Sequence, residues 1–460
     1  MSNRLAAPAV PAFTGLIGAA RVDITPPAGI YFRNWGAATT DVADGVHRPL
    51  TATAISLRAE PDAAPLALVS LDLGWWRSRR DEEFVRHGIL RALDLPASRL
   101  MLSFTHTHAG PVLCRGDADR PGGALIAPYL ESLGDAVACA IHAATAGAIL
   151  ARLEWSCGRC GLAANRDLRD PDRPRFLSGY NPLGTADDTL LVGRATAVSG
   201  APIATLVNYA CHPTTLAWQN RLLSPDFIGA LRDVVESGAG GLCAFLQGAS
   251  GELAPREQYT GDTSVADRHG RALGFAALSA LAAMPPPGTA LAFQGAIESG
   301  APLARWETEP SGASRALDAR LIEVELPLQP MPTVAELDVQ LAACRNRVLA
   351  ERLVRKRRIR EGVGDSQTTA MPLWAWRVGD ALLVGHPNEA YSALQTELRS
   401  RFPGRAITVM NVVNGHFGYL PSAGLYGEDL YPVWQTPFGP GSLETLIEAA
   451  ADAVRSLGCV

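Results

Sequence analysis

Two histidines stand two positions apart where an apolar stretch, residues 99–104, gives way to a Gly-Pro turn. They are His106 and His108, within Thr-His-Thr-His-Ala-Gly-Pro. If the backbone is still extended there, alternate side chains point to one face, so both imidazoles enter the same space. Such a pair supplies a metal ligand and a general base, and the alternative is a hydrogen-bonded structural pair. We predict chemistry, because ligands commonly gather beyond the carboxyl ends of strands in α/β sheets.

A third histidine follows another apolar stretch, residues 203–209. Pro213 forces the preceding His212 into an extended or turn conformation, which fixes the direction of its imidazole. His212 is therefore a candidate metal ligand. The neighbouring Cys211 is the alternative, but strand alternation turns it toward the core, where thiols are commonly inert.

A carboxylate follows the apolar stretch at residues 381–384. We expect a helix to begin at Glu389, with Asn388 as its N-cap. From spacing alone, Glu389 is equally a metal ligand or a residue that only favours the helix dipole. His386 competes with it, and we expect His386 to be a turn residue or a support for a ligand.

A phenol follows the last apolar stretch, residues 406–413. Tyr419 lies in a loop with two glycines, which free the backbone to bring the phenol close to another group. His416, in the same loop, is an equally weak candidate.

The candidates share one setting, since each follows an apolar stretch of strand length. Similar stretches lie at residues 66–73 and 242–246. This alternation predicts an α/β fold in which mixed β-sheets are layered with helices. Apolar spacing of three and four predicts helices at residues 127–148, 227–237, 264–283, 334–361, 390–401 and 442–457. We expect one catalytic domain over residues 1–460, with the option of two packed halves that meet near residues 285–330.

The composition is that of a globular enzyme. Hydrophobic residues make up 47% of the 460 residues and charged residues 19%, which excludes a disordered regulator. The net charge of −5 is interspersed, so we expect no nucleic-acid partner. We interpret the basic run at residues 355–358 as a solvated helix face, because no aromatic residues are interleaved with it. Lys356 is the only lysine, which leaves Schiff-base chemistry almost without a candidate.

The sequence predicts a cytoplasmic protein without stable membrane insertion. The N-terminus lacks the pattern of a signal peptide, and no unbroken apolar run has the length of a membrane span. Eight cysteines are too few for a disulfide scaffold, and we expect Cys157 and Cys160 to be reduced thiols on a strand. Assembly into a homo-oligomer is left open.

Taken together and in this order, the segments resemble the neutral, non-lysosomal ceramidases, a family of zinc-dependent amidases. Residues 21–27 are similar to the family's ADITPP element, and residues 105–111 resemble its THTHSGP element with Ala109 in place of serine. The other matching segments are residues 69–73, 165–166, 212–213, 224–226, 251–255 and 388–389, and Tyr419 with Tyr426 and Tyr431. The resemblance covers nearly the whole chain.

The resemblance implies a metal site and a proton-transfer residue. The implied ligands of Zn²⁺ are His106, His212, Glu389 and Tyr419. For Glu389, which spacing alone leaves open, the resemblance thus favours a metal ligand over a residue that only favours the helix dipole. His108 would act as general base and then as acid toward the leaving nitrogen. Nitrogen and oxygen donors suit zinc, which would polarise a carbonyl and lower the pKa of water.

Further residues are implied around this group. The resemblance implies that Arg166 and Tyr431 face the scissile carbonyl and stabilise its oxyanion. From their positions near strand ends, Asp72 and Asp226 are candidates for orienting the ligands.

Two departures from the family limit the substrate. Ala254 stands where the family has a serine, and we interpret the nearby Ser250 as a loop serine. A water-based mechanism survives this change. The chain ends soon after residues 438–440, where larger members continue into an immunoglobulin-like domain. We therefore expect a ceramidase-like catalytic domain that acts on a small or medium soluble amide instead of ceramide.

Two other functions stay open. The same site could hydrolyse an ester or a lactone, because only the protonation of the leaving group differs. The change at Ala254 is also compatible with a catalytically silent, metal-binding relative, although retention of the ligands and of His108 favours activity. Five aromatic residues lie near matching segments, and we interpret them as core residues and not as the lining of a pocket. They are Tyr31, Phe32, Trp35, Trp75 and Trp76.

Overall fold

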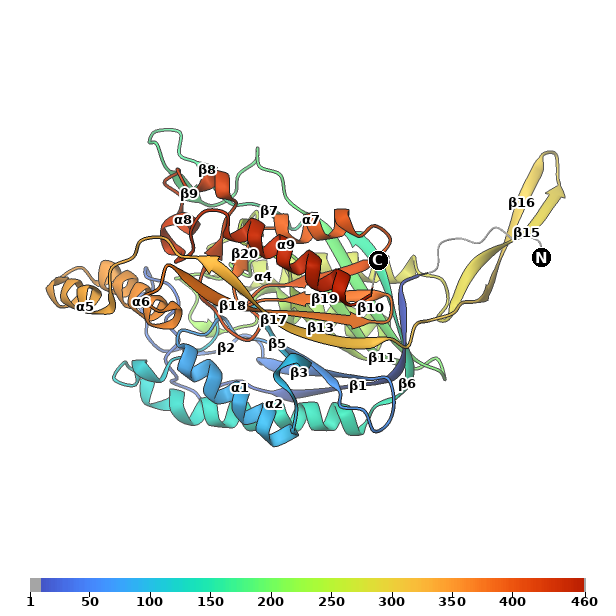
Figure 1. Cartoon of the computed structure of the whole chain (residues 1–460), viewed down its shortest axis with the longest axis horizontal. Coiled ribbons are helices and arrows are strands. Elements are labelled where there is room, and N and C mark those ends of the chain that lie inside the picture. The colour runs from blue at the N-terminus through green and yellow to red at the C-terminus, as the bar shows by residue number, and fades with distance from the viewer. Residues whose placement is uncertain (1–9, 459–460) are drawn as a thin grey trace.

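The computed structural model describes residues 10–458, and its largest element is an eight-stranded mixed sheet (Figure 1). The strand order is β13-β11-β10-β6-β1-β3-β4-β5. Parallel pairs lie at the two edges, where β4 pairs with β5 and β11 pairs with β13. The strands are β1 (Ala12–Asp23), β3 (Thr51–Arg58), β4 (Leu66–Leu71), β5 (Leu100–Phe104), β6 (Ile149–Arg159), β10 (Thr189–Ala197), β11 (Pro202–Tyr209) and β13 (Leu242–Gln247).

A four-stranded sheet packs against the first one. Its order is β17-β18-β19-β21, and β19 and β21 are parallel. Large side chains fill the space between the sheets, among them Phe13, Trp155, Trp374 and Trp376. The strands are β17 (Leu317–Pro327), β18 (Thr368–Val378), β19 (Ala381–Gly385) and β21 (Ala406–Met410).

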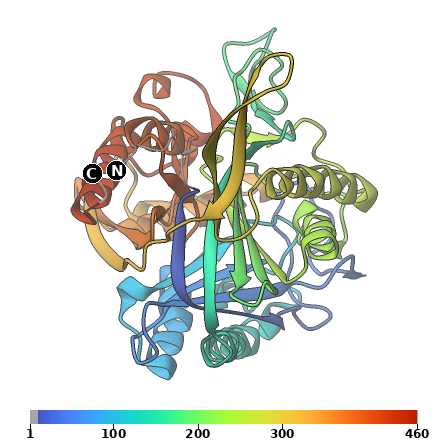
Figure 2. The ribbon, with the colours of Figure 1, turned by 90° about the vertical axis from the view of Figure 1, so that its right-hand side faces the viewer.

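Helices cover the outer faces of both sheets, which gives four layers (Figure 2). On the eight-stranded sheet lie α1 (Arg79–Leu93), α2 (Ile126–Ala146), α3 (Phe227–Ala239) and α4 (Thr263–Ala282). On the four-stranded sheet lie α7 (Ala393–Arg401) and α9 (Ser442–Ser456). Among the described residues, the helical segment Gly123–Ala146 alone is long and apolar enough to cross a membrane, and its Leu130, Leu133 and Val137 are buried in the core beside the sheet.

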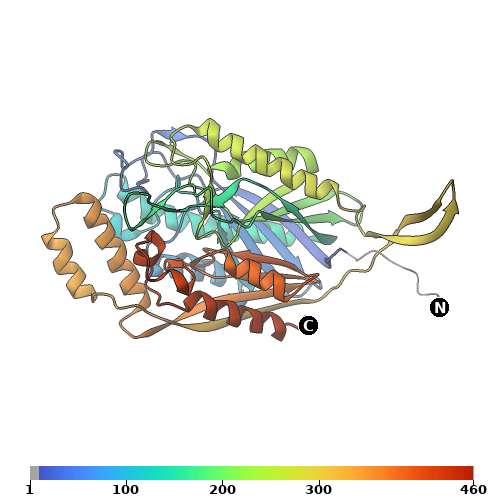
Figure 3. The ribbon, with the colours of Figure 1, turned by 90° about the horizontal axis from the view of Figure 1, so that it is seen from above.

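Two extensions project from opposite ends of the molecule (Figure 3). The hairpin of β15 (Thr289–Glu298) and β16 (Pro302–Pro310) extends at one end. The helices α5 (Val334–Ala343) and α6 (Arg347–Val363) lie at the other.

Short elements connect the layers near the candidate residues. They are β2 (Gly45–Val46) with β12 (Leu222–Leu223), β7 (Ala163–Asn165) with β14 (Leu253–Pro255), β8 (Asp167–Arg169) with β9 (Phe176–Ser178), β20 (Glu389–Ala390) with β22 (Tyr419–Leu420), and α8 (Tyr431–Gln435). These pairs place loops from distant parts of the sequence side by side.

The layered α/β architecture confirms the predicted fold class, and two predicted helices need correction. The segment expected as one helix over residues 334–361 forms two helices, because the first helix ends before Asn346. The Asn346 side chain accepts a hydrogen bond from the Leu349 N–H and caps the start of α6. The helix expected at residue 390 begins at Ala393, and Glu389 lies in β20. The division into two halves near residues 285–330 stays a prediction.

Candidate metal centre

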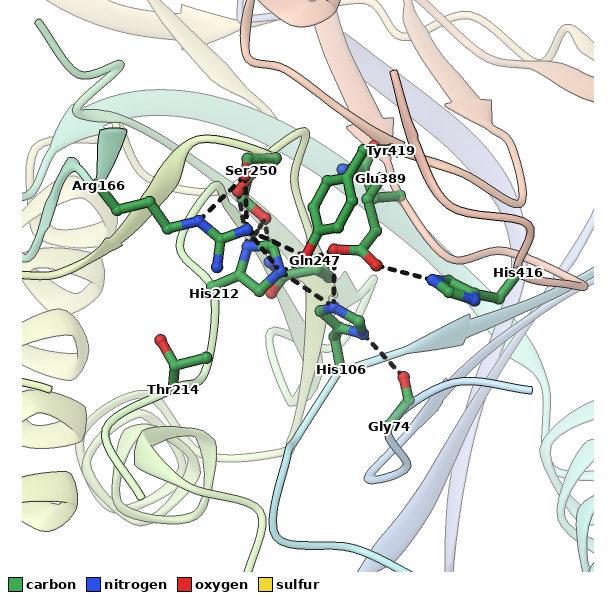
Figure 4. Close-up of polar contacts among 12 residues, drawn as sticks. Gly74, His106, Arg166, His212, Thr214, Gln247, Ser250, Glu389, His416 and Tyr419 are labelled. Atoms are coloured by element: carbon green, nitrogen blue, oxygen red, sulfur yellow. Dashed lines mark hydrogen bonds and ion pairs between the residues drawn. The ribbon is translucent and has the colours of Figure 1, made fainter. Parts of the chain in front are cut away.

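The two edges of the eight-stranded sheet come close together and bring two histidines into contact. The Ser70 hydroxyl on β4 donates a hydrogen bond of 2.6 Å to the Phe245 carbonyl on β13. His106 follows the end of β5 at one edge, and His212 follows the end of β11 near the other. Their Nε2 atoms lie 3.2 Å apart, and both side chains are buried (Figure 4).

A backbone carbonyl holds each of these imidazoles. His106 Nδ1 lies 2.9 Å from the Gly74 oxygen, and His212 Nδ1 lies 2.7 Å from the Ser250 oxygen. Because a carbonyl oxygen only accepts, each Nδ1 carries the proton and each Nε2 is left with a bare lone pair. His106 has a φ of 68°, so the backbone is not extended there, and a turn directs the ring instead.

Glu389 completes an acceptor-rich cluster. Its Oε2 lies 2.9 Å from His212 Nε2 and 3.4 Å from His106 Nε2, and its Oε1 accepts a 2.7 Å hydrogen bond from His416 Nε2. The parallel pairing of β20 with β22 sets Glu389 directly beside Tyr419. Asn388, predicted as an N-cap, is buried, and its side chain makes no hydrogen bond among the described residues.

This cluster has the chemistry of a cation site. Burial lowers the pKa of His212 to about 3. Burial alone would raise the pKa of Glu389, but the imidazoles around it outweigh burial and hold that pKa well below its ordinary value. Neutral His212, whose Nδ1 proton goes to the Ser250 carbonyl, therefore presents its Nε2 lone pair to the same space as the Glu389 carboxylate. Nitrogen and oxygen donors of this kind fit a metal ion such as zinc.

His108 lies beside this group. Its ring centre is 5.1 Å from that of His106 and 5.9 Å from that of His212. The ring nitrogens of these three histidines lie within 4.8 Å of one another, so they could hold a metal ion together. His108 Nε2 is buried and has no hydrogen-bond partner among the described residues. The geometry thus offers His108 as a third nitrogen ligand, whereas the sequence predicts it as the base.

The Tyr419 hydroxyl lies on the other side of His212. It accepts a 3.2 Å hydrogen bond from Arg166 Nη2, and that nitrogen is 3.4 Å from His212 Nε2. The structure therefore brings all four predicted ligands into one region. Which of them bind an ion stays a prediction.

The two predicted oxyanion residues lie next to Tyr419. Arg166 is buried and donates to the Gly251 carbonyl at 2.6 Å. Burial alone would lower its pKa, but Tyr419 and other acidic groups raise it, so the guanidinium stays charged. Tyr431 begins α8, and its hydroxyl accepts a 3.0 Å hydrogen bond from Arg355. Arg355 therefore belongs to this site, which corrects its interpretation as part of a solvated helix face.

A cavity of about 560 Å³ opens onto the cluster. Aromatic side chains form much of its wall, and they are Trp35, Trp75, Trp218, Tyr259, Tyr419, Tyr431 and Trp434. The rings of Trp35 and Trp75 lie 5.1 Å and 4.8 Å from the His108 ring. Trp75 and Tyr31 belong to a buried core cluster, as predicted, but Trp75 also forms part of the cavity wall. Trp35 lines the cavity, so for Trp35 the predicted core role is wrong. Phe32 and Trp76 are buried in apolar clusters, as predicted.

The predicted supporting aspartates do not touch the imidazoles. Asp72 accepts hydrogen bonds from Arg232 at 2.8 Å and from the Thr51 N–H, also at 2.8 Å. Asp226 caps α3 through the Phe227 N–H. Both aspartates stabilise the fold, and backbone carbonyls orient the histidines in their place.

Four further predictions concern residues near the cluster. Cys211 is buried in the core, as predicted. His386 is a buried turn residue whose Nδ1 accepts from the Asn388 N–H at 3.2 Å. Ser250 lies in a loop, as predicted, and its backbone carbonyl orients His212. His416, weakly signalled by the sequence, contacts Glu389 directly.

No family model matches the sequence, and no curated protein matches it. Solved structures that are similar to it include two ceramidases. A neutral ceramidase from Pseudomonas aeruginosa is 18% identical, with a TM-score of 0.69, and the match covers 98% of this chain and 75% of that one. A ceramidase complexed with C2 is 16% identical, with a TM-score of 0.69 over 98% and 76% of the two chains. The chain therefore has a neutral ceramidase-like fold, as its sequence motifs predict.

Proposed function

We propose that the protein is a zinc-dependent hydrolase that cleaves the carboxamide bond of a small or medium soluble substrate. One observation carries the proposal: the Nε2 atoms of His106 and His212 meet the Glu389 carboxylate beside a cavity, next to His108, whose Nε2 has no hydrogen-bond partner among the described residues. The ceramidase-like fold supports it, because ceramidases are named for the hydrolysis of an amide.

The ion would be held by His106, His212, Glu389 and Tyr419. When bound, zinc supplies polarisation of the scissile carbonyl and a lower pKa for water. His108 lines the cavity, and its Nε2 has no hydrogen-bond partner among the described residues, so in the tautomer with its proton on Nδ1 this nitrogen would accept a proton and return it to the leaving nitrogen.

Two donors are placed to stabilise negative charge on the carbonyl oxygen. Arg166 is buried and charged and reaches the Tyr419 hydroxyl. The Tyr431 hydroxyl accepts from Arg355, so its own proton is free to be donated. Preorganised donors of this kind commonly make the largest contribution to acyl-transfer catalysis.

The dimensions of the cavity support a small-molecule substrate. Its volume of about 560 Å³ lies inside the usual range of ligand pockets. Its aromatic wall would bury the apolar part of an amide, and His106, His108 and Glu389 line the same cavity.

The test combines metal content with turnover. We expect mass spectrometry to find about one zinc per chain in the wild-type protein. His212→Ala should lose both the zinc and the hydrolysis of N-acyl amides. His269→Ala is the matched control, because His269 is a buried histidine on α4 that lies outside the cluster.

Assays of esters and lactones beside the N-acyl amides separate the amidase from the alternative functions. If only esters or lactones are hydrolysed, the amidase proposal is wrong and the closely related ester hydrolase is correct. If the protein binds zinc but hydrolyses neither class, it is a silent metal-binding relative. If it neither binds zinc nor hydrolyses any substrate after zinc is supplied, the resemblance extends to the fold alone.

A further inference from the structure

A small side pocket of about 90 Å³ lies next to the main cavity. Trp35, Trp75, Arg355 and His416 line both spaces, so the two are adjacent. Six arginines line the side pocket, and they are Arg33, Arg77, Arg79, Arg120, Arg355 and Arg358. The carboxylates that line it are those of Asp117 and Glu351. The pocket is therefore strongly positive.

The two carboxylates are already paired. Asp117 binds both terminal nitrogens of Arg358 at 2.8 Å and 2.9 Å. Glu351 lies 3.1 Å from Arg33. Neither carboxylate is left to compensate the other arginines.

Two arginines of the pocket have neutral partners only. Arg77 donates to the Arg33 carbonyl at 2.9 Å and to the Asn34 side-chain oxygen at 2.7 Å. Arg355 donates to the Tyr431 hydroxyl. Among residues 10–458, neither guanidinium forms an ion pair with a carboxylate.

Uncompensated cations in a recess favour an anion there. Burial and the nearby charge of Arg355 lower the pKa of Arg77 to about 10, so it is still charged near pH 7. Two desolvated charges of one sign are costly to hold together, and a bound anion relieves that cost. The fork of a guanidinium matches a carboxylate, with which it forms paired hydrogen bonds.

The size and position of the pocket limit what enters it. Its volume corresponds to roughly three water molecules, which suits a carboxylate and excludes an acyl chain. The Arg77 guanidinium carbon is 5.5 Å from the Trp75 ring centre, and the Trp75 ring is 4.8 Å from the His108 ring. One molecule can therefore place an anion in the side pocket and an amide beside His108.

We propose that Arg77 and Arg355 bind a carboxylate of the substrate, so that the substrates are carboxylated amides, of which N-acyl amino acids are the simplest. This inference rests on the proposed function and names its substrate class. The carboxylate lies in the side pocket and orients the scissile bond toward the candidate metal centre.

The test uses pairs of substrates that differ only in charge. N-hexanoylglycine is compared with N-hexanoylglycinamide, and N-butylsuccinamic acid is compared with N-butylsuccinamide. The first pair has the carboxylate on the amine side and the second has it on the acyl side. We expect kcat/KM to favour the acid of at least one pair by about 10- to 100-fold, the range of a charge-assisted hydrogen bond.

Arg77→Met should abolish that preference, mainly through KM, and leave the neutral amides unchanged. Arg80→Gln is the control, because Arg80 is 82% exposed, is paired with Glu361 and lies outside the side pocket. If Arg77→Met does not fold, Val354→Asp offers a second route, because it adds a competing carboxylate to the pocket wall. Thermal melting verifies that each variant is folded.

Binding of N-hexanoylglycine, measured by calorimetry, separates this inference from the proposed function. Equal rates for acid and amide in both pairs would overturn the inference and leave the amidase intact. No turnover of any substrate, with binding that Arg77→Met weakens, would overturn the amidase and keep the carboxylate site. No turnover and no binding would overturn both.

Discussion

The state of two nitrogen atoms decides what His106 and His212 can bind. Each ring donates its Nδ1 proton to a backbone carbonyl, of Gly74 and of Ser250. A backbone carbonyl cannot be removed by side-chain substitution and does not titrate, so it fixes the tautomer across the usual pH range. The pair is therefore ready to bind a cation before any cation arrives.

His108→Ala tests whether His108 is a base or a ligand. As a base, its loss should lower kcat/KM for amides by about 100- to 10,000-fold, and that for esters by less, because an ester's leaving group needs little protonation. Zinc content should stay at the wild-type level. Loss of zinc together with activity would instead identify His108 as the third nitrogen ligand that the geometry also allows.

Glu252 should make stability depend on pH. It is buried, accepts hydrogen bonds from the Ser392 N–H and hydroxyl, and burial raises its pKa from 4.5 to about 7. The folded protein thus holds this proton more tightly than the unfolded chain, so its contribution to stability falls as pH rises from about 4.5 to about 7. Above that range the cost is constant.

Glu252→Gln removes this titration and keeps a hydrogen-bonding group. Relative to the wild type, the variant should gain up to about 3 kcal/mol of unfolding free energy between pH 5 and pH 8, measured by denaturant unfolding. Glu60→Gln is the control, because Glu60 is exposed and distant. A difference that does not change with pH would show that Glu252 is ionised in the folded protein throughout.

Sequence patterns identify the residues of the cluster better than those of its wall. His106, His212 and Glu389 can be predicted because each follows a strand and belongs to a matching motif. Arg355 and Trp75 cannot be assigned in this way, because a basic helix and a tryptophan near a strand are usually solvated or core residues. Only their three-dimensional position beside the cavity shows the difference.

The segment after β21 connects the two sheets and carries part of the site. Asn414 has a φ of 50°, and its side chain accepts from the Leu102 N–H and donates to the Leu100 carbonyl, both at 2.8 Å. These bonds attach the segment to the open edge of β5. They thereby position the loop that contains His416 and Tyr419.

Asn414→Ala should destabilise the protein by about 3 kcal/mol, because two buried backbone groups lose their partners and alanine tolerates this φ poorly. Activity should fall as well, since the loop with His416 loses its anchor. Asp262→Ala is the control, because it removes only the exposed cap of α4 and should cost about 1 kcal/mol without affecting turnover. Wild-type stability in the Asn414 variant would show that the strand pairing alone holds the segment.

Hydrophobic spacing predicts helices with one buried face and strands that are almost wholly buried. The helices α3, α4 and α9 and the strands β4, β5 and β11 lie close to their predicted positions. α1 escapes prediction because charges dominate its sequence, although Val85 and Ile89 are buried. Hydrophobic spacing does not predict the break between α5 and α6, because the only sequence feature that marks it is one capping side chain, that of Asn346. Local spacing also cannot predict the pairing of β20 with β22, which joins distant segments.

The candidate ligands come from both sheets. His106 and His212 follow strands of the eight-stranded sheet, whereas Glu389 and Tyr419 lie beyond β19 and β21 of the four-stranded sheet. An ion shared by these residues would join the two sheets at one point. The stability of the chain and its metal content should therefore be coupled.

Chelation should lower the melting temperature of the wild-type protein by several degrees, because a ligand that binds only the folded state at 1,000 times its Kd adds about 4 kcal/mol to stability. Scanning calorimetry with and without a zinc chelator measures this. His212→Ala, which lacks a ligand, should melt at a temperature that the chelator no longer changes. If both sheets unfold as one unit, a single transition should shift. If two transitions appear and only one responds, the two sheets belong to separately folding halves, and the ion is held by one half alone.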